Sequence, residues 1–149
     1  MGKLSITSFS LTFLYMVGAY ASAFSGKDLS LPTPVDGLSW TFYSTSCPTL
    51  ELIVRELIEF YLNQDITQAA GLLRLHFHEC FVQGCGGSVL LNGTTSERLV
   101  PPNVSLRAMA FTIINGIKAR VEAACSGVVS CADILALASC DSVDKVCNL

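Results

Sequence analysis

Most side chains of this sequence that could carry out chemistry lie in one stretch, LLRLHFHECFVQGCGGS, at residues 72–88. Arg74 and His78 are four residues apart, so on a helix they project from the same face. A cation and an imidazole held side by side suit a proton-transfer reaction in which negative charge also develops. His76 lies two residues from each of them and points elsewhere. The stretch therefore predicts an acid–base site made of Arg74 and His78.

The same stretch also offers possible metal ligands, because His, Glu and Cys side chains can all bind zinc. His76 and His78, however, are at helix positions i and i+2, which do not converge on one ion. We therefore expect His76 to be a structural histidine with satisfied hydrogen bonds rather than a zinc ligand.

Helical periodicity predicts two helices up to this stretch. Residues 50–62 carry apolar side chains at helical spacing with charged side chains opposite, which predicts an amphipathic helix. A second helix is predicted over residues 66–81, with Asp65 as its N-cap and Gln68 closing a capping box. The glycines after it predict a loop.

Two more helices are predicted after a turn-rich segment. Apolar residues over 110–124 predict the third, and Ser130 with Asp133 predicts a capping box that opens the fourth, which should continue to about Ser142. Asp133 either serves only as this cap or joins a wider buried network. The fourth helix is apolar on nearly all sides, which is typical of a central helix. With no long strand pattern, the predicted fold class is all-α, with about four helices.

The first 23 residues have the layout of a secretory signal peptide. Lys3 precedes an apolar core at residues 11–17, and Ala-Ser-Ala follows at residues 21–23. We expect a signal peptide at residues 1–23, one domain over residues 24–149, and a secreted product with no membrane attachment after cleavage. A membrane anchor is the alternative, but this apolar run is short.

The cysteine content and the net charge indicate in which compartment the protein folds and which partners it does not suit. Seven cysteines behind a signal peptide indicate disulfides formed in an oxidising compartment, with at least one thiol left over. The formal net charge of −3 gives no reason to expect a nucleic-acid partner.

Three stretches resemble a known family. They are LLRLHFHECFVQGCGGSVLLNG, GLSWTFYSTSCP before it and VVSCADILALA after it. Together they make residues 38–143 similar to the amino-terminal part of a secreted plant haem peroxidase (class III). The resemblance implies a truncated haem-peroxidase domain that contains only the distal side of the haem site.

The resemblance implies an enzyme that reduces hydrogen peroxide with haem b and oxidises small phenolic donors. By this matching, His78 is the distal acid/base, and Arg74 stabilises the charge that develops as the O–O bond breaks. Phe77 lines the pocket above the haem. Asn103 matches the residue that accepts a hydrogen bond from Nδ1 of the distal histidine, which leaves Nε2 free as the base.

The resemblance also implies a distal calcium site in the loop after the second helix. Its positions are Glu79, the carbonyls of Val82 and Gly84, Gly86, Ser88, and Glu97 through water. Glu79 stands where the family usually has Asp, and Gly86 replaces an Asp ligand. We therefore expect weak calcium binding, and a glycine-rich turn without an ion is the alternative.

Two disulfides follow from the same matching, Cys47 with Cys125 and Cys80 with Cys85. The first closes a loop of about 79 residues and contributes about 4.5 kcal/mol in the chain-entropy model. The second closes about 6 residues and contributes about 2 kcal/mol. The matching leaves three cysteines unassigned, Cys131, Cys140 and Cys147.

In this family a proximal histidine binds the iron, and the resemblance places it beyond Leu149. His76 and His78 are the only histidines of the sequence, and both belong to the distal helix. We expect the proximal ligand to be missing and the chain alone not to be a competent peroxidase. The alternative is a catalytically silent fragment or an incomplete gene model, able to associate through an exposed apolar helix face.

Two glycosylation sequons begin at Asn92 and Asn103. A glycan on Asn103 would be incompatible with a buried bond to His78, so we expect Asn92 to be the modified site.

Overall fold

A computed structural model describes residues 33–82 and 84–148. The chain divides into two compact units, Met1–Trp40 and Thr41–Leu149. The second unit contains the elements α2 (Leu50–Gln64), α3 (Gln68–Cys80), η1 (Ser88–Leu90), η2 (Glu97–Leu99), α4 (Ala108–Ala124) and α5 (Cys131–Cys147). All regular structure in the described residues is helical, which confirms the all-α fold class. The predicted signal peptide, residues 1–23, lies outside the described residues.

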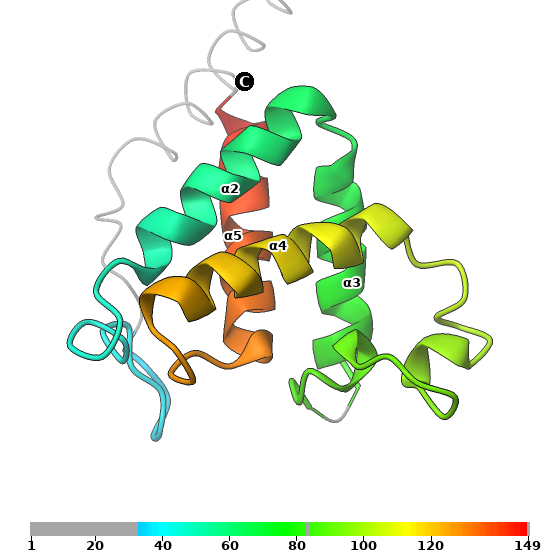
Figure 1. The fold of residues 1–149 in the computed structure, drawn as a ribbon, viewed down its shortest axis with the longest axis horizontal. Coiled ribbons are helices and arrows are strands. Elements are labelled where there is room, and N and C mark those ends of the chain that lie inside the picture. The colour runs from blue at the N-terminus through cyan, green and yellow to red at the C-terminus, as the bar shows by residue number, and fades with distance from the viewer. Residues whose placement is uncertain (1–32, 83, 149) are drawn as a thin grey trace, which may run out of the picture. The chain divides into compact units, whose positions relative to one another are not determined.

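The helix α5 packs against α2, α3 and α4 (Figure 1). Its residues Ile134, Leu135 and Ala138 are fully buried, as its apolar composition predicts. The other helices contribute buried side chains that include Val54, Ile58, Leu72, Leu75, Ile113, Ile114, Ile117 and Val121. Each large apolar side chain buried in this way contributes roughly 1.5–3 kcal/mol. The core therefore fixes α3, which carries the predicted acid–base pair, against a central helix.

The predicted capping box at the start of α5 is confirmed. The Ser130 hydroxyl accepts a hydrogen bond from the Asp133 N–H at 3.0 Å and donates one to the Asp133 carboxylate at 2.7 Å. The same carboxylate accepts a bond from the Tyr43 hydroxyl, 90 residues away, at 2.5 Å. Burial, followed by this bond to Asp133, raises the pKa of Tyr43 above its usual value. Asp133 is thus more than a local cap, because it joins α5 to the segment before α2.

Two predicted helix boundaries were wrong. The helix α3 begins at Gln68 rather than residue 66, and its N-cap Thr67 makes no side-chain cap bond. The Asp65 carboxylate instead accepts bonds from the Thr67 N–H and hydroxyl and from the Gln68 side chain, so it forms a turn ahead of the helix. The helix α5 continues to Cys147, about one turn beyond the prediction, because no glycine or proline interrupts it.

A disulfide joins Cys47, just before α2, to Cys125 at the end of α4, with the Cα atoms 5.6 Å apart. The helices α2 and α4 also approach closely at Gly116, where a Cβ would lie 2.9 Å from the Tyr61 hydroxyl oxygen. Only a glycine permits this approach without displacing Tyr61.

Among the described residues, no helix combines the length and the hydropathy that a membrane span requires.

Candidate active site

One face of α3 carries the predicted acid–base pair together with two aromatic rings. Arg74, Phe77, His78 and Phe81 follow the i, i+3, i+4, i+7 spacing of a single helical face. Phe77 is 54% exposed and Phe81 is 69% exposed, and their ring centroids lie 4.7 Å apart. The Phe77 and His78 rings meet edge to face at 6.0 Å. The face therefore presents an open aromatic surface beside a cation and a half-buried imidazole.

The orientation of His78 is set by Asn103, 25 residues further along the chain. His78 Nδ1 lies 2.7 Å from Asn103 Oδ1, and Asn103 Nδ2 donates to the Glu97 carbonyl at 3.0 Å. A carbonyl can only accept a hydrogen bond, so the NH₂ end of the Asn103 side chain must face Glu97. The oxygen of the same side chain therefore faces His78. Nδ1 of a neutral His78 must then carry the proton, and Nε2 is left with its lone pair free.

Arg74 is held by the same segment that orients His78. Its guanidinium donates to the Ser105 carbonyl at 3.2 Å and to the Ser105 hydroxyl at 2.7 Å. The backbone turns tightly here, since the Leu106 N–H donates to the Asn103 carbonyl at 3.0 Å and Leu106 is buried. Sequence reasoning missed Ser105; its only signal was its place within the Asn103 sequon. The segment from Asn103 to Leu106 thus positions both members of the acid–base pair.

Arg98, which the sequence did not single out, holds the loop between α3 and α4. Its guanidinium donates to the carbonyls of Val89 and Leu90 and stacks on the Phe111 ring, 3.9 Å from the centroid. Burial lowers the pKa of Arg98 from its usual value. This cation ties η1 and η2 to α4, and so supports the carbonyl of Glu97 that orients Asn103.

Glu79 faces the backbone of the following loop. Its carboxylate accepts hydrogen bonds from the N–H groups of Gly87 at 2.5 Å, Ser88 at 3.0 Å and Val89 at 2.8 Å. Gly87 has φ +77°, a left-handed conformation that glycine adopts without strain and that lets successive N–H groups converge. Glu79 is only 6% exposed, so these bonds satisfy a buried charge.

The predicted calcium site stays a prediction, and the contacts of this loop leave few ligand atoms free for it. Glu79 Oε1 accepts two N–H donors and Oε2 accepts one, so the loop backbone already engages both carboxylate oxygens. The Ser88 hydroxyl donates to the Glu97 carboxylate at 2.5 Å, and Gly86 has no side-chain oxygen. Val82 and Gly84 are exposed at the same loop. The Glu79 carboxylate thus ties the loop amides to α3, together with the Cys80–Cys85 disulfide.

We predict that Glu79→Gln lowers the free energy of unfolding by about 2–3 kcal/mol, because three charge-assisted bonds to N–H groups are weakened inside the protein. Urea unfolding followed by circular dichroism measures the change. Glu97→Gln is the matched control: its exposed carboxylate accepts only the Ser88 hydroxyl among the bonds described, so the loss should stay below about 1 kcal/mol.

Calcium removal by a chelator should leave the unfolding midpoint unchanged. A midpoint that falls with the chelator and recovers with added calcium would contradict the assignment of Glu79 to the loop amides.

The two sequons differ in accessibility. Asn103 is 7% exposed, and its amide nitrogen already donates to the Glu97 carbonyl, whereas Asn92 is exposed. A glycan needs the amide nitrogen, so these contacts favour Asn92 as the acceptor.

Comparison with known proteins gives the family of this all-α domain. The peroxidase family model matches residues 54–148, so the chain belongs to the peroxidase family, a class of haem enzymes. The chain is similar to the amino-terminal portion of plant class III peroxidases, which confirms the resemblance.

Individual relatives agree with this assignment. The chain is 58% identical to Peroxidase 25 of Arabidopsis thaliana over 103 residues, which cover 69% of this chain and 31% of that protein. It is 52% identical to Peroxidase 42 of Zea mays over 115 residues (77% and 36%) and 57% identical to Peroxidase N of Armoracia rusticana over 106 residues (71% and 32%). The chain spans about a third of the length of these curated relatives.

Proposed function

We propose that this protein contributes the distal half of a haem peroxidase site, with hydrogen peroxide as the oxidant. The observation that carries the proposal is the 2.7 Å contact between His78 Nδ1 and Asn103 Oδ1. In the neutral imidazole this contact leaves the Nε2 lone pair free on the α3 face that also bears Arg74 and Phe77. A base and a cation on one rigid helix are what peroxide cleavage requires.

In the proposed reaction, His78 Nε2 accepts a proton from one oxygen of hydrogen peroxide and delivers it to the other, which leaves as water. The Arg74 guanidinium stabilises the negative charge that develops on the departing oxygen. Its bonds to Ser105 hold it in place before the reaction, so little reorganisation is needed.

The exposed rings of Phe77 and Phe81 support haem b as the cofactor. They form an exposed apolar surface beside His78. A flat macrocycle such as haem needs an apolar surface of this kind to pack against. Arg74, Phe77 and His78 would line this side. When bound, haem would supply the redox-active iron and the electrons that cleavage of the O–O bond needs.

His78 is unsuited to bind the iron, since a base for the peroxide and an axial ligand cannot share Nε2. His76 lies on the same helix two residues away and faces elsewhere. We therefore propose that the residue that would hold the iron does not come from these 149 residues.

We further propose that the natural reductants are small phenols and that the protein acts outside the cell. The kinship with plant class III peroxidases supports both, and the disulfides are compatible with an oxidising compartment.

The test supplies the missing ligand from solution. The purified chain is mixed with haemin and imidazole, and peroxide-dependent oxidation of a phenolic dye is measured against haemin and imidazole alone. We expect a faster rate with the chain, and a rate at background when imidazole is omitted. A rate at background under both conditions would overturn the proposal and favour a catalytically silent product.

A further inference from the structure

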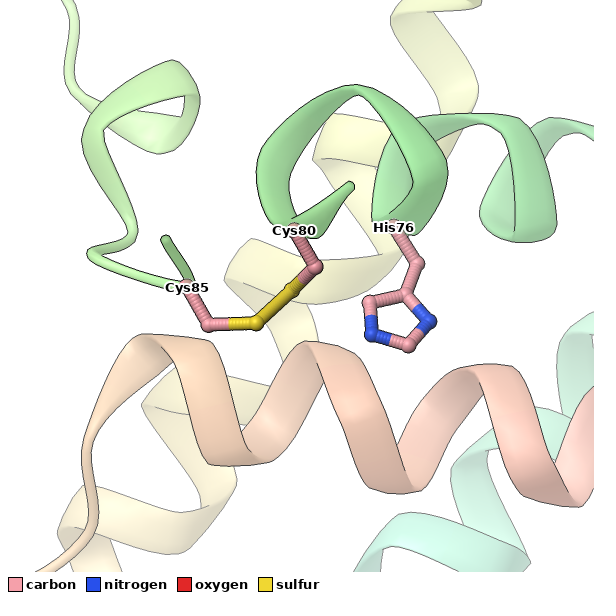
Figure 2. A group of neighbouring side chains, drawn as sticks. All are labelled: His76, Cys80 and Cys85. Atoms are coloured by element: carbon pink, nitrogen blue, oxygen red, sulfur yellow. A yellow bond between two sulfur atoms is a disulfide. The ribbon is translucent and has the colours of Figure 1, made fainter. Parts of the chain in front are cut away.

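A second cluster of reactive side chains lies beside the candidate active site, on a different face of α3. His76 and Cys80 are at positions i and i+4, so they are neighbours on the helix surface. Cys85 comes back to them from the following loop (Figure 2). The ligand atoms of these three residues lie within 4.8 Å of one another. No other group of three such residues was found in the part of the chain that the structure describes.

The His76 imidazole is available in this cluster. It is half-buried, and none of the hydrogen bonds found among the described residues involves its ring. In Figure 2 its ring lies on the same side of α3 as the sulfur atoms. Cys80 is half-buried and Cys85 is exposed, so reductants and ions in solution can reach the sulfur pair.

The two sulfurs are joined as a disulfide in the structure, and a disulfide sulfur lacks the negative charge of a thiolate ligand. The cluster therefore has two states. With the disulfide closed, it is a covalent link between α3 and the loop. With the disulfide reduced, it offers one imidazole and two thiols within reach of a single ion.

We propose that reduction of the Cys80–Cys85 disulfide converts this cluster into a zinc site whose ligands are His76, Cys80 and Cys85. Two thiolates and one imidazole, with water in the fourth position, form a set that tetrahedral zinc accepts. Thiolates select such a borderline-soft ion over magnesium or calcium, which prefer oxygen ligands.

The three ligand atoms need to move only slightly to bind one zinc ion. Zinc–sulfur distances of about 2.3 Å and zinc–nitrogen distances of about 2.0 Å place the ligand atoms roughly 3.3–3.8 Å apart in a tetrahedron. Gly84 and Gly86 flank Cys85, and a Cβ on Gly86 would meet nothing within 4 Å. The loop therefore has room to shift Cys85 when the covalent bond is absent.

The chemical step is balanced as follows. A phosphine reductant attacks one sulfur, the S–S bond breaks, and water supplies the oxygen of the phosphine oxide and the two protons of the thiols. Zinc then replaces the two thiol protons, which are released to solvent. Zinc binding and the disulfide are consequently mutually exclusive.

The experiment uses the full chain with Cys131→Ser, Cys140→Ser and Cys147→Ser, which removes the three free thiols. Cobalt(II) is the probe, since its thiolate charge-transfer absorption reports sulfur ligands, and the metal is added before and after phosphine treatment. Mass spectrometry after thiol alkylation verifies that Cys80 and Cys85 are reduced while Cys47 and Cys125 stay paired. Cys47 is 1% exposed, which favours this selectivity.

We expect one cobalt ion per chain after reduction, none before it, and displacement by zinc. His76→Asn should weaken the metal affinity of the reduced chain more than about tenfold, whereas His78→Asn, on the same helix but facing away, should leave it unchanged. Equal binding by the oxidised chain, no binding after verified reduction, or an undiminished affinity in His76→Asn would each overturn the proposal.

Discussion

Replacing His78 with leucine should lower the peroxidase rate of the haemin- and imidazole-supplemented chain by about 100- to 10,000-fold, measured above the background without protein. The proposed role of His78 is to move a proton between the two peroxide oxygens, and a positioned acid–base group contributes a factor of this size. Leucine is similar in size to histidine but has no nitrogen lone pair that could accept a proton. Initial rates of dye oxidation at several peroxide concentrations provide the measurement.

Arg120→Leu is the control for replacing a polar helical residue outside the site, since Arg120 is exposed on α4. Its rate should equal that of the unmodified chain. Haem titration of each variant separates lost binding from lost chemistry. If His78→Leu binds haem normally and still turns over peroxide at the original rate, the assignment of His78 as the acid–base group is wrong.

Removing the Cys47–Cys125 disulfide should cost about 4–5 kcal/mol of unfolding free energy. The two cysteines are 78 residues apart, so the bond restricts most of the unfolded chain. A domain of this size is stable by only about 5–15 kcal/mol, so Cys47→Ser with Cys125→Ser should leave little of the folded state at 37 °C. Urea unfolding at 15 °C, followed by circular dichroism, measures the loss.

The other disulfide is the comparison. Cys80 and Cys85 are separated by 5 residues, and the double serine variant should lose only about 2 kcal/mol. An equal loss for the two double variants would show that loop length does not govern the contribution of these bonds.

Local patterns predicted the helices well because each depends on neighbours in sequence. The amphipathic spacing of residues 50–62 and the Ser130–Asp133 box required no knowledge of the rest of the chain. The errors lie at ends where a side chain had a choice of partners. Asp65 could cap a helix or bond within a turn, and the pattern alone did not distinguish the two.

The candidate site depended on contacts between distant residues. Arg74 and His78 followed from helical spacing, but the contact of His78 with Asn103 was expected only from the family resemblance. The bonds of Arg74 to Ser105, 31 residues away, had no sequence signal beyond proximity to that asparagine. Which partners Glu79 would choose depended on the backbone conformation at Gly87, which spacing does not specify.

The cluster of His76, Cys80 and Cys85 shows the same limit. The expectation from the sequence compared His76 with His78 alone, two histidines at positions i and i+2. The residue that completes the cluster is Cys85, and the loop returns it to the helix only in three dimensions.

Asn103 is held by two hydrogen bonds, one from each end of its amide. The proposed reaction should therefore depend on the number of residues between Glu97 and Asn103, although those residues do not contact the substrate. Its side-chain oxygen accepts the hydrogen bond from His78, and its side-chain nitrogen donates one to the carbonyl of Glu97, six positions earlier. Deleting a single residue between Glu97 and Asn103 would preserve every reactive side chain and still break one of these two bonds. In this lineage, variation in the length of that short segment should silence the site as effectively as loss of the histidine itself.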